Sequence, residues 1–136
     1  MKEIAVSGLT TIASDVGFAA TAERLEGAIH DKGLTVFAKI DHAAGATEVG
    51  LTLRPTTLII FGNARGGTPL MQSAQTVGID LPLKVLAWED AAGKTWLSYN
   101  EPNWIGQRHN VTGQDQVLGN LANALKAVAG EASKTA

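Results

Sequence analysis

The spacing of apolar residues predicts two long amphipathic helices, one near each end of the chain. The apolar positions of the first recur at helical spacing on one face: Phe18, Ala22, Leu25 and Ile29. Ser14 or Asp15 is expected to cap this helix at its N-terminus, and Gly33 to end it. The opposite face is charged, so this helix should cover a core with one side only.

The second helix lies in the last quarter of the chain. Its apolar stripe consists of Val117, Leu118, Leu121, Leu125 and Val128. Thr112, followed three positions later by Asp115, resembles a capping box with the shorter acid. The low-complexity segment Ala129–Ala136 is expected to fray.

Four segments predict strands: residues 34–40, 56–61, 83–88 and 95–99. The first alternates with period two, which places on one face Leu34, Val36, Ala38 and Ile40. The segment 56–61 is apolar on both faces and is therefore expected to be an interior strand. Residues 89–94 contain a glycine and join the last two strands in a hairpin.

Shorter segments connect these elements. Asp41 is placed as the N-cap of a short helix over residues 42–49, and residues 62–67 as a glycine-rich turn. Thr68 before Pro69 is expected to open another short helix, because proline is favoured at the first helical position. Residues 100–111 are expected to be irregular. The elements together predict a single domain, residues 1–136, with a two-layer α+β fold of four or five strands covered by two long helices.

Composition narrows the class of protein. The chain of 136 residues is 45% hydrophobic and 18% charged, which is typical of a globular domain. It contains no cysteine, so disulfides, thiolate nucleophiles and cysteine-ligated metals are excluded. The net charge is −2 and the basic residues are scattered singly, which argues against a nucleic-acid partner. With no long apolar segment and an acidic residue at position 3, we expect a cytoplasmic protein that does not enter a membrane.

The glycine-rich segment 62–68 is a candidate anion site. Backbone amides in such a turn can bind an anion, helped by the charge of Arg65. The amides concerned belong to Gly66, Gly67 and Thr68. An ordinary glycine turn before a capped helix remains the alternative, and the lysine of a Walker A loop is missing.

Two histidines and a tryptophan are further candidates. His42 follows Asp41 at a helix start, where the dipole favours a neutral imidazole suited to ligation or proton transfer. His109 lies in the segment expected to be irregular, and each histidine could instead satisfy loop backbone. Trp88 lies on the strand face opposite the residues expected to face the core. It therefore either packs under the helices or takes part in a ligand or subunit contact. No spacing of acids and histidines supports a metal site.

Many short motifs occur together in a familiar order. They are Ile40–Ala44, Leu53–Thr56, Phe61–Asn63, Gly67–Met71, Asp80–Lys84, Trp88–Asp90, Gly93–Lys94, Ser98–Asn100 and Arg108–His109. In these motifs the chain, from about Val16 to Leu125, resembles the bacterial and archaeal family called domain of unknown function 302. It departs from the family at Ala64–Arg65, where many members have proline before a basic residue.

The resemblance implies a curved, mostly antiparallel sheet and a homodimer. Haem binding is associated with some members, and on that basis the residues to test as axial ligands are His42 and His109, with Met71 as a third candidate.

Three functions stay open at this point. The first is a small-ligand-binding homodimer, with haem as one candidate ligand. The second is an enzyme acting on an anionic small molecule, held by the 62–68 turn and served by Asp41 and His42. The third is a structural or adaptor dimer without a ligand.

Overall fold

The computed structural model describes residues 6–134. The elements follow one another as β1 (Leu9–Ala13), α1 (Phe18–Asp31), β2 (Thr35–Asp41), α2 (His42–Glu48), β3 (Thr56–Gly62), α3 (Ala64–Ser73), η1 (Gln75–Ile79, a 3₁₀ helix), β4 (Leu83–Glu89), β5 (Thr95–Asn100), α4 (Pro102–Arg108) and α5 (Asp115–Ser133).

All five strands form one antiparallel sheet in the order β1-β5-β4-β3-β2. The apolar strand over 56–61 is confirmed as an interior strand, since β3 lies between β4 and β2. The β4–β5 hairpin is also confirmed, and Gly93 adopts φ +81° in its turn. The strand β1 was not predicted, although its β-branched residues Thr10, Thr11 and Ile12 favour extended backbone.

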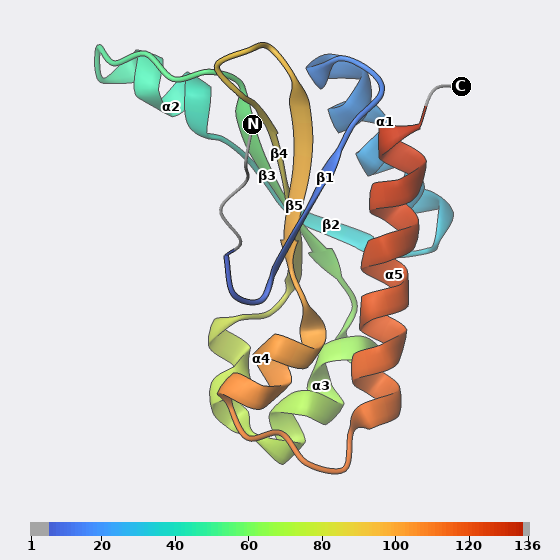
Figure 1. The fold of residues 1–136 in the computed structure, drawn as a ribbon. Coiled ribbons are helices and arrows are strands. Elements are labelled where there is room, and N and C mark those ends of the chain that lie inside the picture. The colour runs from blue at the N-terminus through green and yellow to red at the C-terminus, as the bar shows by residue number, and fades with distance from the viewer. Residues whose placement is uncertain (1–5, 135–136) are drawn as a thin grey trace.

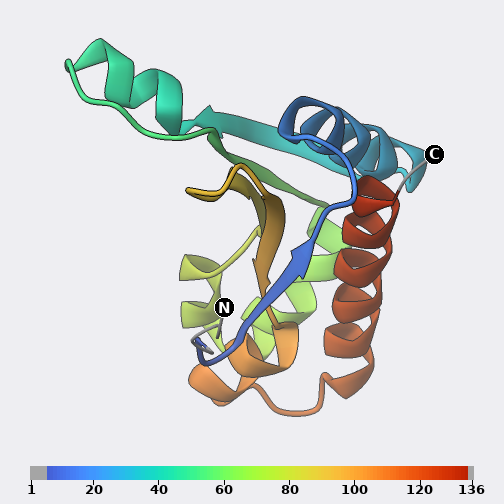
Figure 2. The ribbon, with the colours of Figure 1, turned by 45° about the horizontal axis from the view of Figure 1, so that its top comes forward.

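The two long helices pack side by side against one face of the sheet (Figure 1). Leu25 and Ile29 of α1 meet Leu125 and Val128 of α5 in the main core, and all four are buried. The chain is therefore the two-layer α+β domain that the hydrophobic pattern predicted. Turning the molecule shows that α2 projects from one end of the sheet, while α3 and α4 lie beyond the other end (Figure 2).

The opposite face of the sheet has no helical layer over the strands that the structure describes (Figures 1 and 2). On this face β3, β4 and β5 present apolar side chains that are partly exposed and alternate with buried residues: Leu58, Ile60, Leu86, Trp88 and Trp96. This second face is called the open face below.

A β-bulge in β2 overturns the expectation that its alternate residues share one face. Val36 pairs with buried Phe61 on the helix side, but the register shifts, so that Ala38 pairs with Ile60 and Ile40 with Leu58 on the open face. One extra residue in a strand exchanges its two faces. Leu34 and Val36 thus belong to the core, whereas Ile40 is 40% exposed.

Three helix starts differ from the expected ones. Gly17, not Ser14 or Asp15, is the N-cap of α1, and the Ser14 hydroxyl is instead hydrogen-bonded to Thr21 Oγ1 at 2.7 Å. Gln114 precedes α5, and its expected cap Thr112 instead receives a hydrogen bond from Ser73 Oγ at its carbonyl oxygen.

The third difference concerns residues 62–68. Asn63 caps α3 by accepting the Gly66 amide at 2.8 Å, so most of the expected turn is helix, and Thr68 with Pro69 lies inside it. An asparagine cap needs only one unpaired amide two or three residues ahead, which Gly66 supplies.

The last two corrections concern helix extent. Residues 102–108, within the segment expected to be irregular, form α4 with Pro102 in its first turn. The expected fraying from Ala129 is wrong as far as Ser133, because Ala129 and Ala132 are buried against the sheet and α1 and hold the end of α5 in place.

Candidate functional site

A cavity of about 210 Å³ lies where the first turn of α3, the segment before β4 and the middle of α5 meet. Its lining residues come from four segments of the chain: Leu34, Gly62, Asn63, Gly66, Gly67, Leu81, Pro82, Leu83, Asn120, Leu121 and Ala124. We call it the α3–α5 pocket. Its walls are mostly aliphatic, and its polar lining residues are Asn63 and Asn120.

Two glycines in the first turns of α3 keep this pocket open. A Cβ on Gly67 would lie 3.4 Å from Leu81 Cδ1, and a Cβ on Gly66 would lie 3.2 Å from Leu121 Cδ2. Glycine inside a helix destabilises it by about 1 kcal/mol relative to alanine. Helix α3 therefore contains two unfavourable residues at the positions where side chains would narrow the pocket.

The structure places only part of the predicted anion site at this pocket. Gly66 and Gly67 line it, but the Gly66 amide donates to Asn63 Oδ1, and Arg65 is exposed on the outside of α3. The Gly67 amide also points back to Asn63, at 3.4 Å from its carbonyl oxygen. With these amides engaged and the walls aliphatic, the pocket suits a small apolar molecule with one polar group better than an anion.

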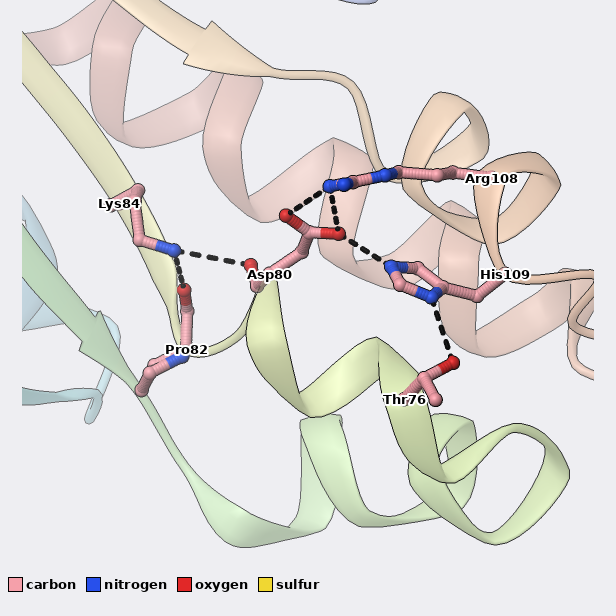
Figure 3. Close-up of polar contacts among 6 residues, drawn as sticks. All are labelled: Thr76, Asp80, Pro82, Lys84, Arg108 and His109. Atoms are coloured by element: carbon pink, nitrogen blue, oxygen red, sulfur yellow. Dashed lines mark hydrogen bonds and ion pairs between the residues drawn. The ribbon is translucent and has the colours of Figure 1, made fainter.

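A hydrogen-bonded cluster lies immediately beside the pocket (Figure 3). Asp80 Oδ2 is 2.5 Å from His109 Nε2, and the two Asp80 carboxylate oxygens accept from Arg108 at 3.0 and 2.9 Å. His109 Nδ1 is 2.9 Å from Thr76 Oγ1. The side chains of Asp80 and His109 are 14% and 9% exposed, so this cluster joins η1 to the end of α4 largely out of solvent.

The chain after Asp80 connects the cluster to the pocket. Leu81, Pro82 and Leu83 line the pocket, and the Lys84 ammonium donates to the carbonyl oxygens of Asp80 and Pro82 at 3.1 and 2.9 Å (Figure 3). Burial lowers the pKa of Lys84, and the nearby Asp80 carboxylate opposes that shift. The pocket wall is thus fixed by polar contacts on both of its sides.

Asp41 and His42 lie at the other end of the sheet. Asp41 caps α2 as predicted, accepting the Ala44 amide at 2.9 Å, and His42 is exposed. In the β2–β3 ladder Asp41 pairs with Thr57, whereas Thr35 pairs with Gly62 at the pocket end. Five residues of strand separate these two ends, or about 17 Å. The structure therefore does not bring Asp41 and His42 to the 62–68 segment.

The candidate haem ligands do not fit a haem within one chain. His109 follows α4 at the pocket end of the sheet, and His42 begins α2 at the opposite end (Figures 1 and 2). Both ring nitrogens of His109 are hydrogen-bonded, and Met71 packs in the small core beside α3 and α4. The pocket is also smaller than the roughly 300–1,000 Å³ typical of sites for larger ligands. Nor do the described residues contain a group of three or more acidic or histidine side chains arranged to hold a metal.

Trp88 belongs to the open face. Its ring stacks on Trp96 with centroids 6.1 Å apart and an angle of 23° between the planes. Trp88 Nε1 donates to Ser98 Oγ, and Trp96 Nε1 donates to Asp90 Oδ2, each at 2.9 Å. Both polar edges are satisfied within the chain, which leaves the flat apolar faces for contacts.

The sequence alone did not identify three residues of the site and its cluster: Asp80, Thr76 and Asn120. Asp80 and Arg108–His109 did occur among the motifs of the family resemblance, and their opposite charges were the available signal. Thr76 and Asn120 carried no signal, because the contacts that involve them join segments far apart in the chain.

These features define a small α+β domain built on one antiparallel sheet, with a pocket and a polar cluster at one end. The chain belongs to the family described as domain of unknown function DUF302, which matches residues 10–128. A crystal structure of an uncharacterized conserved DUF302 protein from Bacillus stearothermophilus has the same fold, with a TM-score of 0.83 and 19% identity. That similarity covers 95% of this chain and 100% of the other.

Curated relatives from Brucella are closer in sequence but longer. The match to "Fluoride-specific ion channel FluC 1" of Brucella suis is 50% identical over 111 residues, which is 82% of this chain and 44% of the relative. A second match, "Fluoride-specific ion channel FluC 2" of Brucella melitensis, has the same identity and covers 41% of that protein. This chain spans less than half the length of these relatives. Within residues 6–134 we find no helix with the length and apolar character needed to cross a bilayer.

Proposed function

We propose that this domain is a binding module for a small, mainly apolar molecule, held in the α3–α5 pocket. The observation that carries the proposal is the pair of helical glycines, Gly66 and Gly67. Their missing side chains leave space against Leu121 and Leu81 at a cost in helix stability. A preformed apolar cavity with few polar groups is the usual form of a small-molecule site.

The size and lining of the pocket define the ligand class. A volume of about 210 Å³ suits a molecule of roughly one ring or a short branched chain. Asn120 supports recognition of one hydroxyl, carbonyl or amide, since its amide group is both donor and acceptor. Haem is outside this class, because neither the pocket volume nor the two histidines favour it.

We further propose that the module acts as a homodimer through the open face. The support is the row of partly exposed apolar residues on β3, β4 and β5, with the Trp88–Trp96 stack at its edge. We also propose a cytoplasmic location and no nucleic-acid partner, supported by the cysteine-free, mildly acidic composition. Fluoride conduction, which names the Brucella proteins, is not part of this proposal for the shorter chain.

Thermal unfolding with benzene as the probe tests the ligand site. A ligand at 100 times its Kd stabilises the folded state by about 2.7 kcal/mol, so the melting temperature should rise with benzene concentration. Ala124→Leu fills the pocket and should remove the rise, whereas Ala127→Leu, on the same helix but outside the lining, should keep it. No response in any of the three proteins would favour the adaptor dimer without a ligand, and equal rises in all three would show that benzene binds outside the pocket.

The enzyme alternative predicts a different response. Phosphate should raise the melting temperature of the wild-type protein, and Arg65→Ala should remove the effect. We expect no phosphate effect, because the Gly66 amide is already bonded to Asn63.

A haem titration tests the remaining ligand that the family resemblance suggested. We expect no stoichiometric Soret shift with the wild-type protein. A Soret band that His42→Ala or His109→Ala abolishes would show that haem is the ligand and would overturn the choice of pocket.

A further inference from the structure

Three side chains, from η1, from the residue after it and from the end of α4, form a continuous hydrogen-bonded chain from a shielded carboxylate to an exposed hydroxyl. Asp80 Oδ2 contacts His109 Nε2 at 2.5 Å, and His109 Nδ1 contacts Thr76 Oγ1 at 2.9 Å (Figure 3). Asp80 and His109 are largely buried, while Thr76 lies on the surface of η1.

The contacts fix the roles of the atoms in the neutral ring. An ionised carboxylate only accepts hydrogen bonds, so the proton of a neutral His109 must be on Nε2. Nδ1 then carries the lone pair, and the Thr76 hydroxyl donates to it. A hydroxyl that donates to an imidazole whose other nitrogen is held by a carboxylate is the arrangement that activates a nucleophile.

Arg108 holds the carboxylate in place for this role. Its guanidinium donates to both oxygens of Asp80, which leaves Oδ2 shared between Arg108 and His109. The Asp80 carboxylate therefore cannot rotate away from the ring without breaking an ion pair. Asp80, held by Arg108, therefore sets the orientation of the His109 ring, and the Thr76 hydroxyl does not.

An exposed apolar residue lies on the same face of η1 as Thr76. Ile79 follows Thr76 by three residues in the 3₁₀ helix η1, and side chains three apart in such a helix are eclipsed. Ile79 is 77% exposed, although it is a large aliphatic residue. It offers a surface for the apolar part of a molecule that reacts at Thr76.

We propose that Thr76 is an acyl-acceptor site, with His109 as its general base and Asp80 as a positioning residue. In the step, Thr76 Oγ1 attacks the carbonyl carbon of an activated ester or thioester whose small apolar acyl group lies on Ile79. The new Oγ1–C bond forms, the bond from carbon to the leaving oxygen or sulfur breaks, and the hydroxyl proton passes to His109 Nδ1. That proton then passes to the leaving group, so the products are O-acyl-Thr76 and an alcohol or thiol.

The same contacts also fit a simpler role, in which the cluster only fastens η1 to α4. The two roles differ in what they require of the Thr76 hydroxyl. A fastening needs its hydrogen bond but gives it no reactivity, whereas an acyl acceptor must react faster than other exposed hydroxyls. General base catalysis ordinarily contributes about 10²- to 10⁴-fold to such a reaction.

The test is acylation of the full chain by p-nitrophenyl acetate, followed by release of p-nitrophenol and peptide mass mapping. We expect one acetyl group per chain at Thr76, retained in Thr76→Ser and lost in Thr76→Val. Thr47→Val is the matched control, because Thr47 is an exposed helical threonine whose hydroxyl bonds only a backbone carbonyl. His109→Gln should slow the labelling at position 76 by about 100-fold or more.

The role of Asp80 is separated from a fastening role by the rate of acylation at Thr76. Asp80→Asn should slow this acylation at a temperature where the variant is folded, because an asparagine can hold the imidazole in the wrong tautomer. A fastening role alone would lower the melting temperature without changing this rate. Acetyl groups spread over lysines and the control threonine, or labelling at position 76 that is unchanged in His109→Gln, would overturn the proposal.

Discussion

The carboxylate of Asp80 lies 2.5 Å from His109 Nε2, and this contact joins the segment before β4 to the end of α4. Leu81, the next residue, lines the α3–α5 pocket. One shielded polar contact therefore holds a pocket wall in place, and the cluster and the pocket form one unit at the same end of the sheet.

Removal of the Asp80 carboxylate should loosen that wall. Asp80→Ala deletes hydrogen bonds to Arg108 and His109, and a hydrogen bond to a charged group contributes about 1.5–3 kcal/mol. We expect a loss of about 2–3 kcal/mol in urea unfolding. Benzene binding should weaken as well, measured at a temperature where the variant is folded. A variant as stable as wild type would show that the cluster does not support the fold.

Gly67→Ala should raise the stability of the protein while lowering its affinity for benzene. Gly67 has no positive φ, and its new Cβ would meet Leu81 and Met71 at ordinary contact distances of 3.4 and 3.7 Å. The change should stabilise α3 by about 0.5–1 kcal/mol, as alanine does in helix interiors. It also narrows the pocket, so benzene affinity should fall. Chemical denaturation and benzene titration of the same sample measure both effects, and a destabilised variant with unchanged affinity would contradict them.

Asp90 should make the β4–β5 hairpin sensitive to acid. The Trp96 indole N–H lowers the pKa of this carboxyl first, followed by the backbone amides of Lys94 and Ala92. A carboxyl whose pKa is depressed on folding adds stability above its ordinary value of 3.8. That stability is lost as the pH falls through the lower, folded value.

Urea unfolding of wild type and Asp90→Asn, from about pH 5 to about pH 2, measures this contribution. The variant should be less stable than wild type at about pH 5 and should show a flatter decline in acid. Parallel pH profiles for the two proteins would assign the acid sensitivity to other groups.

The open face should hold two copies of the chain together. Leu86 lies in the middle of this face and pairs across the sheet with Leu58 and Ser98. Leu86→Glu places a charge in the proposed interface and should convert a dimer to a monomer in sedimentation equilibrium. Lys126→Glu on the exposed side of α5 is the control and should stay dimeric. A monomeric wild-type protein would contradict the proposed homodimer.

The elements with a clear period were predictable from the sequence. The faces of α1 and α5 follow from apolar residues at helical spacing, and the interior position of β3 follows from its uninterrupted apolar run. The bulge between Val36 and Ala38 was not predictable, because the sequence keeps its alternation while the backbone exchanges the two faces. The start of α3 was misplaced because Thr68-Pro69 and Asn63 are both good cap signals, and it is the Asn63 side chain that accepts a helix amide, that of Gly66.

The site was predictable only in part. Gly66 and Gly67 were found as a glycine-rich segment, but their role in the pocket depends on α5, more than 50 residues later in the sequence. His109 was found as a histidine of interest, while its partners Thr76 and Asp80 come from η1 and the residue after it. Contacts of this kind depend on the tertiary fold, which local spacing does not encode.

The most direct test of the central claim is a ¹H–¹⁵N NMR titration of the wild-type protein with benzene. Binding in the α3–α5 pocket predicts saturable shifts that centre on the amides of Gly66, Gly67 and Leu121, and that are absent in Ala124→Leu but present in Ala127→Leu. Shifts centred on the open face around Trp88, or unsaturable shifts spread over the whole chain, would contradict the pocket as the ligand site.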